Sequence, residues 1–194
     1  MPRIVSWDLA QALARRDALV AVYRRAFTVS YAAGDHWGDE VLPTHGARAG
    51  FRFLGALDPP AGPDGADSCG EPVGPDPETV VGLVYGYTGE HGQRWTDRAA
   101  GVLTQEQSQR WLGGHFEVVE IAVDPSRQGR GIGRLLHDGL LAQLPHTRAL
   151  LSTDDKQTPA MNLYRASGWK VLAPVGDHSV IMGIELPLRP GDPT

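Results

Sequence analysis

The sequence predicts a mixed α/β (α+β) domain built on a central, twisted, mixed sheet. Short apolar runs rich in β-branched residues recur along the chain, as in HFEVVEIAV at residues 115–123. In the second half these runs alternate with amphipathic helical patterns in the order strand, helix, strand, helix, strand, which favours a sheet covered by helices. The 194 residues show no internal repeat, so we expect a single domain over residues 1–194. It should hold six to seven strands and about four helices.

The first half supplies two strands and one clear helix. RIVSWD at 3–8 and FRFLGALD at 51–58 are short strand candidates. Between them, DALVAVYRRAFTVSY at 17–31 predicts a helix, and residues 35–50 predict a polar, partly helical connection. The apolar face of the helix is formed by Leu19, Val22, Tyr23, Ala26 and Phe27.

Residues 58–77 interrupt the pattern of strands and helices. This segment consists mostly of proline, glycine and acidic residues. Such a composition buries too little apolar surface to offset the entropy lost on ordering, so we expect a flexible loop that joins two strands of a hairpin. The next strand candidate, ETVVGLVYGYTGE, covers 78–90. LTQEQSQRWL at 103–112 then predicts a short helix, because Thr104 and Gln107 have capping-box spacing.

The second half carries the strongest pattern. The strand at 115–123 is followed by GIGRLLHDGLLAQL at 131–144, whose apolar residues have helical spacing and which Pro145 is expected to end. Another helix is expected to begin after Thr158, which a proline follows, and to stop at Gly168. The remaining strand candidates are TRALLST (147–153), WKVLAP (169–174) and HSVIMGIEL (178–186).

Composition and charge exclude several classes of function. The net charge is −5, so the chain has no general basic surface for a nucleic acid. No apolar run approaches the ~20 residues of a membrane span. Cys69 is the only cysteine, which excludes an intrachain disulfide and favours a cytoplasmic location. The seven histidines show no metal-ligand spacing, so we expect no metal.

Three glycines at alternate positions stand where the first helix of the second half begins. Gly129, Gly131 and Gly133 follow a strand and a short connection. The first amides of a helix lack intrahelical acceptors, and glycine has no Cβ to obstruct an anion that approaches them. Arg130 and Arg134 add positive charge. The glycines therefore predict a phosphate cradle, with a plain glycine-rich turn as the simpler alternative.

The spacing of these glycines can be compared with the known phosphate-binding motifs. A Walker P-loop needs a lysine that is absent here. A Rossmann fingerprint needs a third glycine where Leu136 stands. Asp154 and Asp155, about 20 residues further on, would suit a Rossmann ribose contact, so a partial Rossmann unit stays an alternative.

One motif points to a family. QGRGIG at 128–133 resembles the Q/R-x-x-G-x-G/A motif of the GCN5-related N-acetyltransferase (GNAT) family, with Gln128, Gly131 and Gly133 in the defining positions. EIAVDPSR, just upstream, is similar to that family's fourth strand, and TPAMNLYRASGWKV at 158–171 to its late helix and strand. The resemblance covers the C-terminal half. It implies a GNAT-like fold, in which two strands splay apart at the cofactor site.

The resemblance implies acetyl-CoA, the acetyl thioester of coenzyme A, as the acyl donor. Its pyrophosphate would bind the amides from Gln128 to Arg134, and its pantetheine arm would pair with the strand backbone as an added strand does. Gln157 stands where the family often has an asparagine that contacts the cofactor. The residues implied in cofactor binding are Ile121, Ala122, Val123, Gln128, Gly129, Arg130, Gly131, Ile132, Gly133, Arg134, Gln157 and Tyr164.

Glu117, Glu120 and Tyr164 are the candidate catalytic residues. Acetyl transfer to an amine needs a base that removes the proton of the amine and an acid that protonates the departing thiolate. Because Glu117 and Glu120 are three residues apart on a predicted strand, we expect them on opposite faces, with one facing the acceptor and Glu117 slightly favoured as base. Either could instead form a salt bridge. The resemblance gives Tyr164 the role of the acid; an ordinary core tyrosine is the alternative.

We therefore expect an N-acetyltransferase that moves an acetyl group from acetyl-CoA to a primary amine by direct transfer in a ternary complex. A small-molecule amine is favoured over a protein amine, with no nucleic-acid or membrane partner. GDHWGDE at 34–40 would border the acceptor, where acids and an indole could hold a cation, unless Trp37 packs in the core. A homodimer is common in the family. A non-catalytic acyl-CoA sensor is an alternative from another class.

Overall fold

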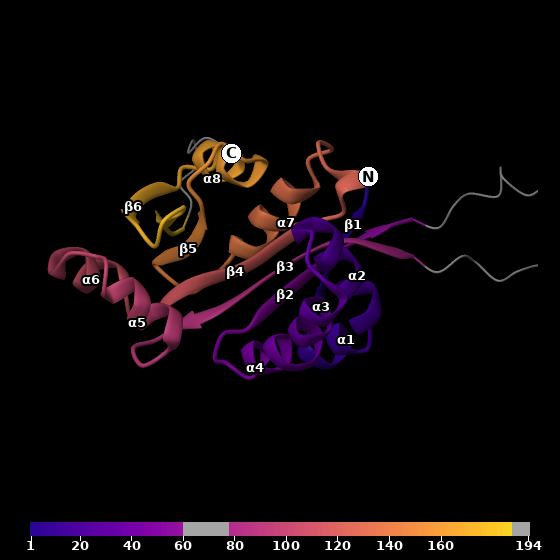
Figure 1. Cartoon of the computed structure of the whole chain (residues 1–194), viewed down its shortest axis with the longest axis horizontal. Coiled ribbons are helices and arrows are strands. Elements are labelled where there is room, and N and C mark those ends of the chain that lie inside the picture. The colour runs from indigo at the N-terminus through magenta and orange to yellow at the C-terminus, as the bar shows by residue number, and fades with distance from the viewer. Residues whose placement is uncertain (60–77, 188–194) are drawn as a thin grey trace, which may run out of the picture.

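Seven strands form one sheet in the order β1-β2-β3-β4-β5-β7-β6 (Figure 1). Neighbouring strands are antiparallel except β4 and β5, which run parallel, so the predicted mixed sheet is confirmed. The computed structural model describes residues 1–59 and 78–187. The strands are β1 (Arg3–Trp7), β2 (Arg52–Asp58), β3 (Thr79–Gly89), β4 (His115–Val123), β5 (Arg148–Asp154), β6 (Lys170–Pro174) and β7 (Ser179–Glu185).

β2 and β3 pair in the antiparallel arrangement expected of a hairpin. Asp58 at the end of β2 lies opposite Thr79 at the start of β3. The loop predicted over 58–77 lies outside the described residues from position 60 on, and so does Cys69.

The helical segments outnumber the clear helical patterns of the sequence. The additional ones are only three to seven residues long, too short to show a helical period. No helix in the described ranges is long and apolar enough to cross a membrane. The segments are α1 (Leu9–Leu13), α2 (Arg16–Phe27), α3 (Tyr31–His36), the π-helical turn η1 (Trp37–Val41), α4 (Leu42–Gly46), α5 (Arg94–Ala100), α6 (Gln105–Trp111), the 3₁₀ turn η3 (Pro125–Arg127), α7 (Ile132–Leu141) and α8 (Pro159–Ala166).

Capping residues begin two of the helices where the sequence predicts. Thr104 forms a capping box with Gln107 at the start of α6. Thr158 accepts a hydrogen bond from the Met161 amide at the start of α8. The end of α7 differs from the expectation: the chain leaves the helix at Ala142, which is extended, before it reaches Pro145. The proline therefore does not end this helix.

Helices cover both faces of the sheet. α7 contributes Leu136 and Leu140 to a core on one face, which α8 extends. α2 contributes Leu19 and Val22 to a second core on the opposite face. Figure 1 shows α7 on one side of β2, β3 and β4, and α1 to α4 on the other. The two layers of helices hold the middle of the sheet between them.

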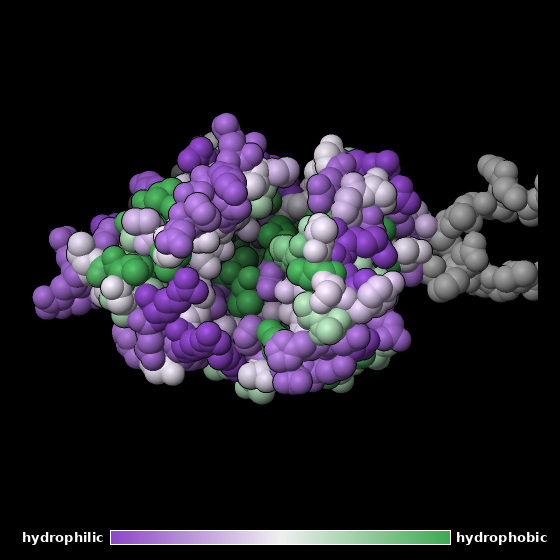
Figure 2. Space-filling view, viewed as in Figure 1, coloured by the Kyte–Doolittle hydropathy of each residue, from purple (hydrophilic) through white to green (hydrophobic). Residues whose placement is uncertain are grey.

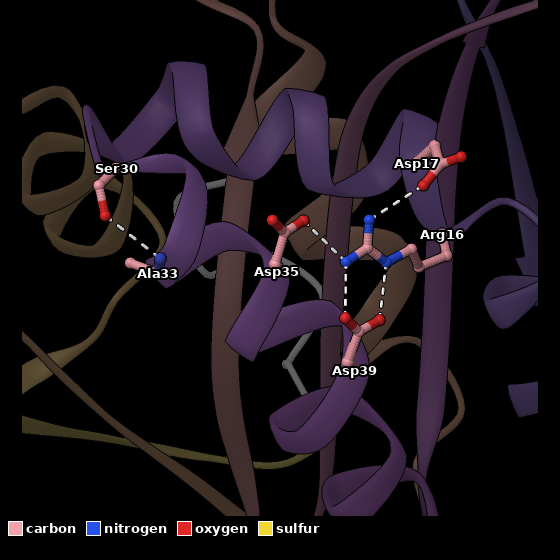
Figure 3. Close-up of polar contacts among 6 residues, drawn as sticks. All are labelled: Arg16, Asp17, Ser30, Ala33, Asp35 and Asp39. Atoms are coloured by element: carbon pink, nitrogen blue, oxygen red, sulfur yellow. Dashed lines mark hydrogen bonds and ion pairs between the residues drawn. The ribbon is translucent and has the colours of Figure 1, made fainter.

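Arg16 joins α2 to the segment formed by α3 and η1 (Figure 3). Its guanidinium donates to both carboxylate oxygens of Asp39 at 2.8 Å and to Asp35 at 2.8 Å, and it also pairs with Asp17. Asp35 and Asp39, two of the acids of residues 34–40, therefore already have a cation partner. Trp37, in the same segment, is 2% exposed and packs in the core. The cation site considered for this segment is thus replaced by an ion cluster and a core tryptophan.

We expect Arg16→Lys to lower the melting temperature, because an ammonium group cannot make the two parallel bonds to Asp39 while it also reaches Asp35. Differential scanning calorimetry at low and high salt would measure the loss, which salt should reduce. Arg15→Lys is the matched control, since Arg15 donates to the main-chain carbonyl of Gln11. Equal melting temperatures for the two variants would contradict the expectation.

Candidate active site

A bulge in β4 sets the direction of its two glutamates. Glu120 lies opposite Tyr85 of β3 and Glu117 opposite Tyr87, whereas Val119 has no counterpart in the register. Tyr85 and Tyr87 are two residues apart and share one face of the sheet, so their partners share it too. The prediction that Glu117 and Glu120 face opposite sides is therefore wrong, because the extra residue shifts the alternation by one position. On this face the Tyr87 hydroxyl donates to Glu117 Oε1 at 3.0 Å.

β4 and β5 separate soon after they meet. Only Phe116 and Glu117 of β4 have partners in β5, namely Ala149 and Leu150, although both strands continue. From Val118 onward the edge of β4 toward β5 has no β5 partner in the described part of the chain, so its amides and carbonyls can serve a ligand. The splay implied by the family resemblance is confirmed, and Figure 1 shows the two strands diverging.

The amino-terminal end of α7 presents amides that have no intrahelical acceptor. Gly131 is the N-cap, with a φ of 79°, and no side chain among the described residues caps the helix. The first intrahelical bond runs from the Leu135 amide to the Gly131 carbonyl at 3.0 Å. The amides of residues 132–134 therefore donate no intrahelical hydrogen bond. Together with the helix dipole, they attract an anion to this end of α7.

A groove of about 410 Å³ connects this helix end to β4 and α8. Figure 2 shows a cleft that descends between α8 and α7 to a hydrophobic floor over β4. Its walls come from the end of β4, the loop that follows, the start of α7 and the first half of α8. The lining residues are Ile121, Val123, Gln128, Gly129, Gly131, Ile132, Gly133, Arg134, Pro159, Ala160, Asn162 and Leu163.

The α8 wall is the part that sequence reasoning missed. Four residues of α8 line the groove although the sequence does not mark them as site residues: Pro159, Ala160, Asn162 and Leu163. Their only signal was an amphipathic helical pattern, which is the same whether a face covers a core or a ligand. Gln128 has a structural contact as well: its side-chain amide donates to the Val123 carbonyl at 3.1 Å and holds the loop against β4.

Some of the predicted cofactor contacts do not line the groove. Ala122 is 2% exposed and belongs to the core on the α2 side of the sheet. Arg130 and Gln157 are exposed on the loops before α7 and α8. Tyr164 is 5% exposed and belongs to the core on the α7 side. None of these four residues forms part of the groove wall.

Burial changes the proton affinity of both glutamates. Glu117 is 3% exposed, and its burial raises its pKa to about 7 although the Tyr87 hydrogen bond and the charge of Arg48 oppose the rise. Burial also raises the pKa of the half-buried Glu120 to about 7. Within residues 1–59 and 78–187, the Glu120 carboxylate forms no hydrogen bond or ion pair. A carboxyl group with a pKa near neutrality is suited to general-base catalysis.

The Tyr164 phenol is held in its protonated form. Burial raises its pKa well above the usual range, and the negative charge of Glu120 raises it further. The hydroxyl has no hydrogen-bond partner among the residues described. Tyr164 therefore carries a proton at neutral pH and lies within electrostatic range of Glu120.

An aromatic wall stands on the sheet beside Glu120. Tyr23 of α2 stacks on Trp37 of η1, with ring centroids 4.4 Å apart and planes inclined by 6°. Trp37 Nε1 donates to the Tyr85 hydroxyl at 3.3 Å, and that hydroxyl lies 3.1 Å from His45 Nδ1. Burial lowers the pKa of His45 to about 4, so the ring is neutral at neutral pH, and its Nδ1 shares a hydrogen bond with the Tyr85 hydroxyl. The wall is thus fixed by hydrogen bonds as well as by packing.

A model of the Acetyltransferase (GNAT) family matches residues 56–169, which is more than half of the chain. The chain belongs to the GNAT acetyltransferase family. The matched region runs from β2 past α8 and includes the whole groove.

The chain is similar in sequence to two acetyltransferases and in fold to one solved structure. The GCN5-like protein acetyltransferase Rv2170 of Mycobacterium tuberculosis is 34% identical over 100 residues, 46% of this chain and 48% of the relative. A mycothiol acetyltransferase of Clavibacter sepedonicus is 36% identical over 89 residues, 40% of this chain and 29% of the relative. The chain thus spans half or less of the length of these relatives. The PaiA N-acetyltransferase of Thermoplasma acidophilum, solved with coenzyme A, shares the fold, with a TM-score of 0.55 and 15% identity over 95% of this chain and 99% of that one.

GNAT membership removes the partial Rossmann alternative. α7 joins β4 to β5, the one parallel pair of the described sheet, whereas a Rossmann sheet is mostly parallel. No group of three or more His, Cys, Asp or Glu side chains in the described ranges is arranged to hold a metal ion. The groove in this GNAT chain is lined by main-chain amides and by mostly apolar side chains.

We expect Glu120→Gln to stabilise the protein at pH 8 and to have little effect at pH 5. The pKa of Glu120 rises on folding from 4.5 to about 7, so its contribution to stability is fully present below pH 4.5 and is lost as the pH rises through 7. The amide stays neutral and escapes this loss. Melting temperatures of both proteins at the two pH values test the sign. Glu106→Gln, at an exposed position of α6, is the control, and a larger gain at pH 5 than at pH 8 would refute the expectation.

Proposed function

We propose that this GNAT protein transfers the acetyl group of acetyl-CoA directly to a primary amine of a small molecule, with both substrates bound in a ternary complex. One observation carries the proposal: the groove has an uncapped helix end at one side and the free edge of β4 along its floor. A ligand with a phosphate group and a long arm that can bond to a strand edge satisfies both features. Coenzyme A has these two parts.

The chain offers a partner for each part of coenzyme A. The amides of residues 132–134 would hold the pyrophosphate. Arg134 Nη1 is buried without a partner in the described part of the chain, so its charge is available to a phosphate oxygen. Ile121, Val123 and Leu163 give the arm an apolar wall. When bound, the thioester supplies an acetyl carbonyl that an amine can attack.

Glu120 is the proposed general base. Its carboxylate has no protein partner among the described residues, and its pKa of about 7 lets it take a proton from an ammonium group at neutral pH. Glu117, slightly favoured by the sequence, has one oxygen bound to Tyr87 and is almost fully buried. These contacts favour Glu120 as the group that meets the acceptor.

Tyr164 is the proposed acid. It is protonated at neutral pH and lies on α8, beside the groove. In the proposed reaction the amine loses its proton to Glu120, and the departing thiolate takes the proton of the Tyr164 hydroxyl, so that the amide and the thiol leave uncharged while Glu120 holds a proton and Tyr164 is a phenolate. The phenolate is then reprotonated before the next turnover.

A small-molecule acceptor is favoured because Glu120 is half-buried beside the wall of Tyr23, Trp37 and Tyr85. In the proposed complex the amine approaches this carboxylate beside the three rings. The relative named for mycothiol supports a small acceptor, and the relative named as a protein acetyltransferase supports the less favoured protein amine. A cytoplasmic location, a single domain over residues 1–194, a homodimer and the lack of a metal stay predictions from the sequence.

The deciding experiment mixes the purified protein with acetyl-CoA and a panel of primary amines that includes small monoamines, diamines, amino acids and lysine peptides. A colorimetric assay measures the free thiol, and mass spectrometry detects the acetylated product. We expect thiol release that depends on a small amine. Coenzyme A binding without turnover on any amine would instead support a sensor, and turnover on peptides alone would move the acceptor to proteins. No calorimetric signal with coenzyme A would overturn the proposal.

We expect Gly131→Ala to weaken coenzyme A binding about tenfold, or about 1.4 kcal/mol, because its Cβ would crowd the amides that hold the phosphate. The left-handed backbone at this position, with a φ of 79°, adds a folding cost of about 1–2 kcal/mol for any residue with a Cβ. Gly92→Ala separates the two effects, since Gly92 has a φ of 86° in a loop outside the groove. Isothermal titration with coenzyme A is the measurement, and equal affinities in the two variants would count against the phosphate cradle.

We expect Tyr164→Phe to lower kcat about 100-fold, within the range usual for loss of a general acid, while the affinity for coenzyme A changes little. Steady-state kinetics with the best amine of the panel and a titration with coenzyme A give the two numbers. Tyr31→Phe is the control, because Tyr31 is 74% exposed. A parallel loss of turnover and affinity in Tyr164→Phe would contradict the assigned role.

A further inference from the structure

A chain of hydrogen bonds runs through the core behind Tyr164. The indole Nε1 of Trp169 donates to His137 Nε2 at 2.9 Å. On the other side of the same ring, His137 Nδ1 lies 2.7 Å from Asp138 Oδ1. Trp169 and His137 are 4% and 1% exposed, whereas the Asp138 carboxylate reaches the surface. The buried polar groups of Trp169 and His137 thus form hydrogen bonds with each other and with one carboxylate.

Only one form of the histidine fits these contacts. An indole nitrogen can only donate, so His137 Nε2 must be the unprotonated nitrogen that accepts. The proton of the neutral ring is therefore on Nδ1, from which it is donated to Asp138. Asp138 selects this tautomer, and the tautomer in turn fixes the direction of the Trp169 indole.

The indole of Trp169 and the imidazole of His137 both pack against the Tyr164 ring. The ring centroids of Tyr164 and Trp169 are 5.8 Å apart, and those of Tyr164 and His137 are 6.2 Å apart. The Trp169 amide also donates to the Tyr164 carbonyl at 3.0 Å, where the chain turns out of α8 through Gly168, which has a φ of 86°. Trp169 therefore contacts Tyr164 through its backbone and through its ring.

The position of the Tyr164 hydroxyl depends on this packing. The hydroxyl has no hydrogen bond of its own among the residues described, so no polar contact of Tyr164 itself orients the ring. His137 belongs to α7, the helix whose first amides line the groove. The hydrogen-bonded chain thereby ties the ring of Tyr164 in α8 to the helix at the phosphate end of the groove.

We propose that Trp169, His137 and Asp138 are positioning residues, which hold the Tyr164 ring in the orientation from which its hydroxyl gives its proton to the departing thiolate. The proposal rests on the proposed function for the proton transfer, but the fixed ring is a property of the protein alone. None of the three residues lines the groove. Their contribution therefore acts on turnover through Tyr164 and leaves coenzyme A binding unchanged.

The first test is a double-mutant cycle. Trp169→Phe keeps an aromatic ring at the position but removes the indole donor and part of the buried ring volume, so Asp138→Ala, which leaves both rings intact at a partly exposed position, is the gentler change. We expect Trp169→Phe to lower kcat about tenfold, or about 1.4 kcal/mol, with an unchanged KM for acetyl-CoA. In the Tyr164→Phe background the same change should cause no further loss, because the hydroxyl that it positions is gone. Losses that multiply in the double variant would overturn the proposal.

The second test does not require turnover. The protein has five tyrosines, so 3-fluorotyrosine labelling gives a small set of ¹⁹F signals, and Tyr164→Phe identifies one of them. We expect slow ring flips of Tyr164 in the unaltered protein and faster flips in Trp169→Phe and Asp138→Ala. Trp95→Phe, which removes an indole hydrogen bond to Ser152 outside the groove, should leave the signal unchanged.

The two tests separate this proposal from the proposed function. If no amine is acetylated but the Tyr164 flips respond to Trp169→Phe, the fixed ring is supported and the acetyl transfer is not. Suppose instead that amines are acetylated and that Tyr164→Phe lowers kcat, but that Trp169→Phe has the same kcat and the same Tyr164 flip rate as Trp95→Phe. The positioning role is then refuted, while the proposed acetyl transfer is still supported.

Discussion

The early separation of β4 from β5 is the constraint on which the rest of the site depends. Two parallel strands normally continue their ladder, and here the ladder stops after Phe116 and Glu117. The edge of β4 beyond that point keeps its amides and carbonyls free of β5, and α7, which connects the two strands, begins beside the opening. A longer ladder would close the groove with backbone hydrogen bonds. The gap thus places a strand edge and a helix end in one cavity, which no single element could supply.

The bulge at Val119 acts together with this gap. It brings Glu117 and Glu120 to the same face of the sheet, opposite two tyrosines, where burial raises the pKa of each to about 7. Two desolvated carboxyl groups on one face lower stability at neutral pH. They also differ in their contacts, because the Tyr87 hydroxyl engages Glu117 while Glu120 has no hydrogen-bond partner among the described residues. The same local irregularity therefore lowers stability at neutral pH and leaves one carboxyl group without a hydrogen-bond partner among the described residues.

Local patterns predicted the strands and the glycine-rich helix start that lines the groove, whereas contacts between distant segments were not predictable. The β-branched runs, the cap at Thr158 and the glycines around Gly131 act over a few residues, so the sequence displays them directly. The bulge leaves no such mark, because an extra valine in an apolar strand looks like any other strand residue. The bond between His137 and Trp169 joins residues 32 apart and depends on how α7 packs against the turn after α8, which no spacing rule contains.

α7 links the groove to the ring of Tyr164 because it is anchored in the core. Its first turn presents amides to the groove, its middle carries His137, and its buried face packs through Leu136 and Leu140. A close-packed helix moves as a unit, so a shift that disturbs the phosphate end would also displace the ring behind Tyr164. The acceptor side is held differently, by the exposed ions around Arg16 that secure η1 to α2. These ion pairs are exposed and therefore weaken with salt, whereas the stack of Tyr23 on Trp37 and the buried bond from Trp37 to Tyr85 also hold the aromatic wall, so the wall does not depend on the ions alone.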